Sequence, residues 1–168
     1  MDHDVTVRAE TAGDEDAIRD VILAAFPTPY EADLVEALRR DPAWIPRLSR
    51  VAVGRGGRVL AHALLTRCHV GETPALALAP VAVLPEAQRK GLGALVTRDA
   101  LETAREHGES AVVVLGHPEY YPRFGFTTAS RHGIEATFEA PDEALMAMSL
   151  DGAPLPKGTI RYAPPFGV

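Results

Sequence analysis

The stretch PALALAPVAVLPEAQRKGLG, residues 74–93, decides how this chain is expected to fold. Its apolar part, residues 75–84, is long and nearly continuous, which is typical of a strand buried on both faces. The segment QRKGLG follows, and apolar residues then recur at helical spacing until Gly108. A second apolar run, AVVVLG (111–116), and the aromatic segment HPEYYPRFGF (117–126) complete the unit. This order of strand, glycine-containing loop, helix and strand predicts a cradle for a phosphate-bearing cofactor.

The loop QRKGLG is expected to lie between the buried strand and the first turn of the helix. The N–H groups of a first turn lack partners within the helix and carry a partial positive charge, which suits an anion. Gly91 and Gly93 would let the backbone approach a diphosphate closely, and Arg89 and Lys90 add positive charge beside them. The third glycine of a dinucleotide-binding loop and the lysine-containing end of a P-loop are both missing. The glycines alone leave a strand–helix junction without a ligand as the alternative.

Periodicity in the rest of the chain predicts an α/β fold, with a mixed sheet, in one domain of 168 residues. Two helices are expected early in the chain, one carrying Ile18 to Phe26 and one between Pro29 and Asp41. GRGGR, residues 54–58, is a hairpin signal between two apolar segments. The remaining predicted elements are strands over 5–10, 51–53, 59–65, 111–115, 134–138, 145–149 and 159–162, and a short helix over 119–124.

Composition excludes several classes of protein. The net charge is -6 with no block of Lys or Arg, so the electrostatic footprint of a nucleic-acid-binding protein is missing. No stretch approaches the roughly 20 apolar residues of a membrane span, and the charged start does not resemble a signal peptide, so a cytoplasmic protein is expected. The single Cys68 excludes an internal disulfide and is expected to fill space in a strand. The histidines and acidic residues show no metal-ligand spacing, so no metal is expected.

Three residues of the loop point to a family. Gln88, Gly91 and Gly93 match the pattern Q/R-x-x-G-x-G/A, and the chain resembles the GNAT superfamily of acetyl-CoA-dependent N-acetyltransferases. Tyr121, four residues before the pair Gly125-Phe126, resembles the second motif of that family. The segments LGHPEYYPRFGF and TPYEADLVEALR are also similar to those of the small bacterial YhbS-like group.

The resemblance implies a GNAT-like fold with acetyl-CoA as the acyl donor. Such a fold has a central, mostly antiparallel sheet, flanked by helices and splayed between strands 4 and 5. The backbone of Val81, Ala82 and Val83 would then line the pantetheine arm and the thioester, with the Val83 N–H at the oxyanion. The diphosphate would be held by Gln88, Arg89, Lys90, Gly91, Leu92, Gly93 and Ala94.

Two side chains are the expected catalytic residues. Tyr121 would hydrogen-bond the departing sulfur, since full proton transfer from a Tyr (pKa about 10) to a thiolate (about 8.5) is uphill by roughly 2 kcal/mol. Glu31 would accept the proton of the amine, which an alkylammonium with a pKa near 10.4 loses slowly without help. Packing is the alternative role for Tyr121, and a favourable position in a helix's first turn is the alternative for Glu31. His117 and Glu119 follow the fifth strand, and His62 is expected to be structural.

The sequence thus predicts transfer of an acetyl group from acetyl-CoA to a primary amine by direct attack in a ternary complex. A non-catalytic acyl-CoA-binding sensor or assembly module is the alternative. The acceptor, a small molecule or a peptide, would be recognised by residues 27–31 and the C-terminal strands, where no motif identifies it. The resemblance leaves a homodimer open.

Overall fold

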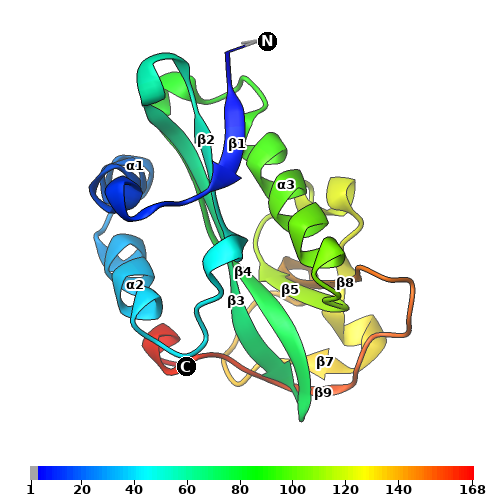
Figure 1. Cartoon of the computed structure of the whole chain (residues 1–168). Helices are drawn as coiled ribbons and strands as arrows, with labels where there is room; N and C mark the ends of the chain where they lie inside the picture. Colours follow the sequence, from blue (N-terminus) through cyan, green and yellow to red (C-terminus); the bar gives the residue numbers. More distant parts are fainter. Residues whose placement is uncertain (1–3) are drawn as a thin grey trace.

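Residues 4–168, which the computed structural model describes, form three α-helices and nine β-strands (Figure 1). The helices are α1 (Glu15–Ala25), α2 (Tyr30–Arg39) and α3 (Leu92–Glu106). The strands are β1 (Thr6–Ala9), β2 (Ser49–Val53), β3 (Val59–Val70), β4 (Thr73–Val83), β5 (Ala111–Leu115), β6 (Thr127–Thr128), β7 (Ile134–Glu135), β8 (Leu145–Ser149) and β9 (Gly158–Arg161).

The strands form one mixed sheet between helices. Its central order is β1-β2-β3-β4-β5-β8-β6, and β9 pairs with both β3 and β7. The neighbours in the central order are antiparallel except for β4 and β5, which run parallel. Helices α1 and α2 lie on one side of the β3–β4 hairpin and α3 lies on the other (Figure 1). The expected sheet, mostly antiparallel and flanked by helices, is confirmed.

A bulge changes the course of β4 halfway along its pairing with β3. Ala63 pairs with Val81 and Leu65 pairs with Leu78, so β4 uses one more residue than β3 over this interval. Such a bulge bends the strand that contains it and increases its local twist. Pro80, which lies inside the bulge, has no N–H to donate to a neighbouring strand.

Strands β4 and β5 separate after a short stretch of pairing. Within residues 4–168, their register comprises only Leu76 with Val112 and Ala77 with Val113, although β4 continues to Val83. The other edge of β5 is paired with β8 along its whole length. The expected splay between strands 4 and 5 is therefore confirmed, and it leaves an open edge on β4.

Three predicted elements differ from the structure. Strand β3 extends to Val70 instead of residue 65, because a turn at Gly71, with φ +58°, brings β4 directly alongside it. The strand predicted over 134–138 is only Ile134–Glu135, since its pairing with β9 ends there. The helix predicted over 119–124 is a 3₁₀ turn, η5 (Tyr121–Phe124), and the short β6 was not predicted.

The interior of β3 holds two groups that could be mistaken for reactive residues. Cys68 is buried, and burial raises the pKa of its thiol to about 12, so it fills space as predicted. His62 is also fully buried, and burial, with a smaller effect of the Arg39 charge, lowers its pKa to about 3. Both groups are therefore uncharged at neutral pH.

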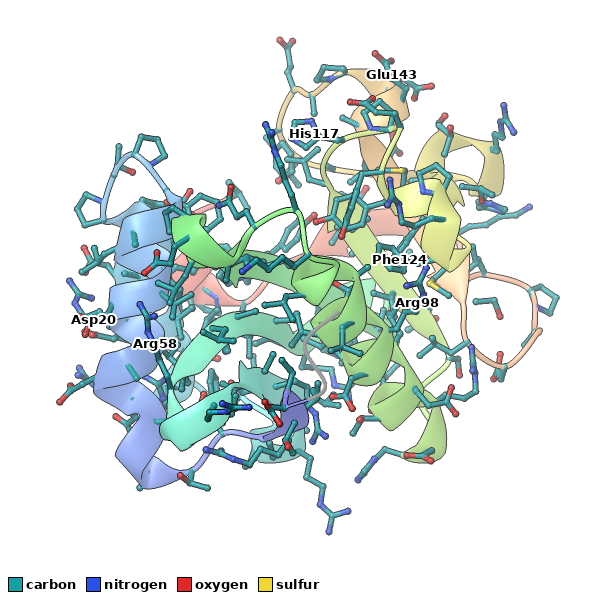
Figure 2. The ribbon with its side chains drawn as sticks, turned by 90° about the horizontal axis from the view of Figure 1, so that it is seen from above. Asp20, Arg58, Arg98, His117, Phe124 and Glu143 are labelled. Atoms are coloured by element: carbon teal, nitrogen blue, oxygen red, sulfur yellow. The ribbon has the colours of Figure 1, made fainter. Side chains whose placement is uncertain are left out.

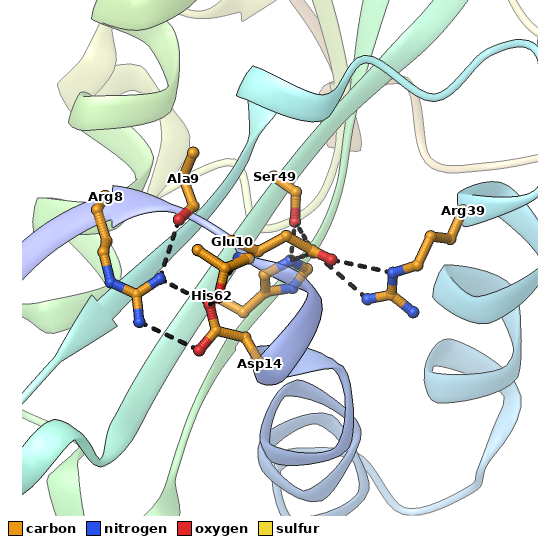
Figure 3. A network of polar contacts seen from close by, with 8 residues as sticks. Arg8, Ala9, Glu10, Asp14, Arg39, Ser49 and His62 are labelled. Carbon is orange, nitrogen blue, oxygen red and sulfur yellow. Dashed lines mark hydrogen bonds and ion pairs between the residues drawn. The ribbon is translucent and has the colours of Figure 1, made fainter.

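A buried polar network connects His62 to α2 (Figure 3). Arg39 Nε donates to Glu10 Oε2 at 3.0 Å, and the Ser49 hydroxyl donates to Glu10 Oε1. His62 Nε2 lies 2.8 Å from the Ser49 oxygen, which is left to accept its proton. Glu10 follows β1, Ser49 begins β2, and His62 lies in β3, while Arg39 is the last residue of α2. The network therefore fixes the end of α2 against the sheet.

Because folded His62 is buried and neutral, we expect the free energy of unfolding of the protein to depend on pH. Below about pH 6.5 the unfolded chain takes up a proton that folded His62 does not, so stability falls as the pH drops. The difference in free energy of unfolding between the wild type and His62→Gln should therefore shrink by up to about 1.4 kcal/mol per pH unit below that pH. Urea denaturation between pH 5 and 8 measures it. The exposed His117→Gln variant is the control, and a difference for His62→Gln that stays constant with pH would contradict the prediction.

Candidate active site

A cavity of about 640 Å³ lies where β4 and β5 separate. Residues 77–81 of β4 and residues 113–117, from β5 and the segment after it, form one part of its lining, together with Tyr121. The end of α1 and the first turns of α2 contribute Phe26, Tyr30, Glu31 and Leu34. The later part of the chain contributes Phe138, Tyr162, Phe166 and Val168.

The loop before α3 has the geometry of an anion site. Gly91 is the N-cap of α3 with φ +80°, a left-handed conformation that glycine adopts without a steric cost. The first-turn N–H groups of Leu92, Gly93 and Ala94 follow it, and the side chains of Arg89 and Lys90 are exposed at the same end. A helix of 15 residues therefore begins at a positively charged loop.

The open edge of β4 presents backbone groups to the gap. The Leu84 N–H donates to the Leu60 carbonyl at 2.9 Å, so the backbone of Leu84 is directed toward β3. Because successive residues of a strand direct their N–H and C=O groups to opposite edges, Val83 and Val81 are directed toward the gap. The Gln88 amide donates to the Val83 carbonyl at 3.1 Å, which agrees with this direction.

Tyr121 is held by aromatic neighbours and by one glycine. Its ring lies 5.1 Å from the Tyr120 ring and 5.8 Å from the Phe126 ring, both edge to face. A Cβ added to Gly116 would lie 2.3 Å from Cε2 of Tyr121, so the ring rests directly on the Gly116 backbone. Burial, with a smaller contribution from Tyr120, raises the pKa of Tyr121 to about 12. The hydroxyl is therefore protonated and can donate a hydrogen bond at neutral pH.

The turn η5 that contains Tyr121 is attached to α3. The Arg98 guanidinium of α3 lies over the Phe124 ring, 5.1 Å from its centroid (Figure 2). An added Cβ on Gly93 would lie 3.4 Å from the Tyr120 hydroxyl, so the start of α3 is also close to the residue before η5. The loop before α3 and the Tyr121 ring consequently belong to one rigid assembly.

Glu31 lies in the first turn of α2 and has an unusual environment. It lines the cavity, and its Oε1 atom is buried without a hydrogen-bond partner among residues 4–168. Other acids of α2 are engaged elsewhere, since Arg19 bridges Asp33 and Glu36 at 3.0 and 2.9 Å. A buried carboxylate oxygen without a partner is costly, so a cationic or donor group is its natural complement.

The residues selected from the sequence fall into two groups. Val81, Glu31 and Tyr121 line the cavity, whereas Val83 and residues 88–94 lie along the adjoining edge and loop. The Ala82 side chain is buried in the core. His117 lines the cavity but is 83% exposed, near the periphery of the molecule in Figure 2, and Glu119 beside it is exposed too.

Sequence reasoning missed Gly116 and the aromatic residues Phe138, Tyr162 and Phe166. Gly116 closes the apolar run AVVVLG, and its position before a Tyr-rich segment was the available signal. The three aromatic residues lie in weakly patterned segments, where only the structure brings them together.

Metal-binding clusters and membrane-spanning helices are both missing from residues 4–168. In that part of the chain, no group of three or more His, Cys, Asp or Glu side chains is arranged to hold a metal ion. None of its helices has the length and apolar character needed to cross a membrane.

Residues 16–126 match the acetyltransferase (GNAT) family. The chain belongs to this family. Two relatives extend the similarity of this GNAT protein over most of its length. It is 38% identical to the uncharacterised N-acetyltransferase YjhQ of Escherichia coli (strain K12), over 97% of the chain and 94% of that protein. It is 30% identical to the uncharacterised N-acetyltransferase YhbS of the same strain, over 86% of each.

Solved structures of GNAT proteins have the same fold. The crystal structure of Escherichia coli YhbS in complex with CoA has a TM-score of 0.89 at 26% identity, covering 98% of this chain and 92% of that one. A GNAT acetyltransferase from Brucella melitensis in complex with acetyl-CoA has a TM-score of 0.81 at 30% identity, covering 98% and 99%. The resemblance to the YhbS-like group that the sequence indicated is therefore confirmed.

The contact between Gly116 and Tyr121 predicts the effect of one added methyl group in this GNAT protein. Because the Cβ of Gly116→Ala would lie 2.3 Å from Cε2, the ring must move away from its place in the cavity. The kcat for acetyl transfer should fall at least tenfold, which is about 1.4 kcal/mol in the barrier. CoA release with the best acceptor of an amine panel measures it. Gly13→Ala, whose Cβ would have no atom within 4 Å, is the control, and equal kcat values for the two variants would contradict the assignment.

Proposed function

We propose that this GNAT protein transfers the acetyl group of acetyl-CoA to a primary amine by direct attack in a ternary complex. The observation that supports this most is the cavity at the β4–β5 splay, which is lined by the open edge of β4, by Tyr121 and by Glu31. A donor entering along β4 and an amine entering from α2 would meet there.

The residues present fit the donor. Acetyl-CoA supplies an activated acetyl group as a thioester when it is bound. The N–H groups of Gly91 to Ala94 and the charges of Arg89 and Lys90 would hold the diphosphate. Gln88, which contacts the Val83 carbonyl, would fix the loop to the open edge of β4. That edge, with Ala82 between Val81 and Val83, would bind the pantetheine arm through its backbone groups. Complexes with CoA and acetyl-CoA among the structural relatives support this arrangement.

We assign the oxyanion donor to Val81 in place of Val83, the residue expected from the sequence. Val81 lines the cavity together with Tyr121. Val83 lies farther along β4, where its carbonyl contacts Gln88 and its Cγ2 is close to Gly93. The Val81 N–H would therefore donate to the carbonyl oxygen of the thioester, while Val83 would contact the pantetheine arm.

Three groups of the protein would act on the reaction. Glu31 accepts one proton from the ammonium, RNH₃⁺, and so frees the lone pair that forms the new C–N bond. The Val81 N–H stabilises the negative charge on the carbonyl oxygen, and Tyr121 donates a hydrogen bond to the sulfur as the C–S bond breaks. After the C–N bond has formed, the nitrogen loses its second proton to solvent, and the departing thiolate takes one proton from solvent. Overall, RNH₃⁺ and acetyl-CoA give the N-acetylamine, CoA as a thiol and one released proton.

Tyr121 would act as a hydrogen-bond donor, and the proton would remain on its oxygen. Its pKa of about 12 is well above the ordinary thiol value. With a thiol pKa of about 8.5, full transfer to the thiolate would be uphill by roughly 5 kcal/mol. The sulfur would therefore take its proton from solvent after it has left.

Replacing Tyr121 with Phe removes the proposed hydrogen bond to the sulfur and keeps the ring. The variant should bind acetyl-CoA with a Kd close to that of the wild type but lower kcat by about 10- to 100-fold, because a hydrogen bond to a charged group contributes about 1.5–3 kcal/mol. In the wild type, kcat should show no decline from Tyr121 ionisation up to about pH 10, given its pKa of about 12.

The measurement is CoA release over a panel of alkylamines, polyamines, aminoglycosides and peptides, with acetyl-CoA affinity from thermal unfolding. Acetyl-CoA at about 100 times its Kd should raise the free energy of unfolding by about 2.7 kcal/mol. Full kcat in Tyr121→Phe would refute the role of this hydroxyl. Stabilisation of the wild type without CoA release from any amine would instead indicate a non-catalytic acyl-CoA-binding module.

The Glu31→Gln variant lacks the proposed base. At about pH 7 its kcat/KM should fall by about 10²- to 10⁴-fold, the usual contribution of a general base. The deficit should narrow as the pH rises toward about 10.4, because the free amine then forms without the carboxylate. Glu36→Gln, on the same helix but paired with Arg19, is the matched control. A deficit that is the same at pH 7 and pH 10 would contradict a base at this position.

A further inference from the structure

We propose that the acceptor is a primary monoamine with an apolar body, an alkylamine or an arylalkylamine, whose ammonium binds Glu31. This inference rests on the acetyltransferase function proposed above and names the substrate class of the same cavity. It is carried by the distribution of charge and of aromatic side chains over the cavity lining.

One side of the cavity is an aromatic wall, formed by Phe138, Tyr162 and Phe166. The Tyr162 ring is 5.9 Å from the Phe138 ring and 5.2 Å from the Phe166 ring, so the three form a continuous surface. Phe26 and Leu34 add apolar surface from α1's end and from α2. An apolar body of an acceptor would be removed from water by this surface.

The aromatic wall is attached to the helix that carries Glu31. The Tyr30 hydroxyl donates to the Phe166 carbonyl at 3.0 Å, and Tyr30 precedes Glu31 at the start of α2. The end of the described chain accordingly lies beside α2 (Figure 1). Glu31 and the aromatic wall are thus fixed relative to each other, so an acceptor can contact both.

The charged side chains that line the cavity can balance one ammonium group of an acceptor. Among the described residues that line the cavity, Glu31 is the only acidic side chain. Burial raises the pKa of the Tyr162 hydroxyl above its ordinary value, so it is neutral and cannot balance a cation. His117 is largely exposed and adds no negative charge. A second ammonium, as in a polyamine or an aminoglycoside, would be desolvated against the aromatic wall without a second acidic side chain to pair with it, which is strongly unfavourable.

The size of the cavity agrees with a small acceptor. A volume of about 640 Å³ is in the range of small-molecule sites. Part of it must hold the acyl end of the donor, since residues 77–81 and 113–117 belong to the lining. The remaining space suits an amine with a short chain or a single ring.

The experiment compares amines that differ in one property at a time. From propylamine to hexylamine, kcat/KM should rise about fourfold with each added methylene. This factor corresponds to the free energy gained when one CH₂ group is removed from water. Hexylamine and 1,6-diaminohexane share a carbon chain and differ by one terminal ammonium, and the diamine should be at least tenfold poorer. Spermidine and a lysine peptide should be poorer still.

Variants of the aromatic wall test its part in this preference. Phe138→Ala should lower the ratio of kcat/KM for hexylamine to that for propylamine by at least fivefold. Phe166→Ala should lower the same ratio, and Phe138→Leu should lower it less. Leu23→Ala, an exposed position on α1 outside the cavity, should leave it unchanged. Thermal unfolding and acetyl-CoA affinity show that each variant is folded.

The outcomes separate this inference from the proposed function. A diamine, spermidine or lysine peptide that equals or exceeds hexylamine in kcat/KM would overturn the apolar acceptor while the acetyltransferase function stands. A hexylamine preference that Phe138→Ala and Phe166→Ala leave intact would overturn it as well. No CoA release with any amine would overturn the proposed function. In that case, stabilisation of the protein–CoA complex by hexylamine but not by the diamine would still support the apolar site, and its absence would refute it.

Discussion

The hydrogen-bond ladder between β4 and β5 stops after two residue pairs, and the site depends on this interruption. Unpaired backbone groups in a protein interior need partners, and an edge without a strand leaves several of them open. On β4 the Gln88 amide binds one such group, the Val83 carbonyl. The N–H groups of Val81 and Val83 are directed to the same gap, so this edge offers hydrogen-bond donors to the extended donor molecule proposed above.

The rest of the fold keeps the gap open. Strand β8 occupies the outer edge of β5, while the bulge in β4 bends β4 itself. On the opposite side, the buried network of Glu10, Ser49 and His62 holds Arg39 at the end of α2. A helix anchored at that end can present Glu31 at its other end without the carboxylate having a protein partner.

The sequence was sufficient to predict the splayed strands and the glycine-containing loop before α3, because these features depend on local patterns. Gly91 is required where φ is positive at the start of α3, and the apolar run 111–115 is the strand β5 that was predicted. The acceptor side depends on residues far apart in the chain. Phe138 was predicted to lie in a strand, but the pairing of β7 ends at Glu135, and Phe138 contacts Tyr162 instead. No local pattern encodes such a contact, because it joins two segments that are far apart in the sequence.

The family match ends at residue 126, and every residue of the aromatic wall comes after it. The open edge of β4, the loop before α3 and Tyr121 therefore belong to one stretch of the chain, and the aromatic wall belongs to another. The link between the wall and the start of α2 is a hydrogen bond to a backbone carbonyl, that of Phe166, which any side chain at that position would retain. In the proposed reaction, the residues of the aromatic wall can therefore vary between relatives and change the acceptor preference, provided that β8 and β9, which belong to the same stretch and pair with β5 and β3, are retained.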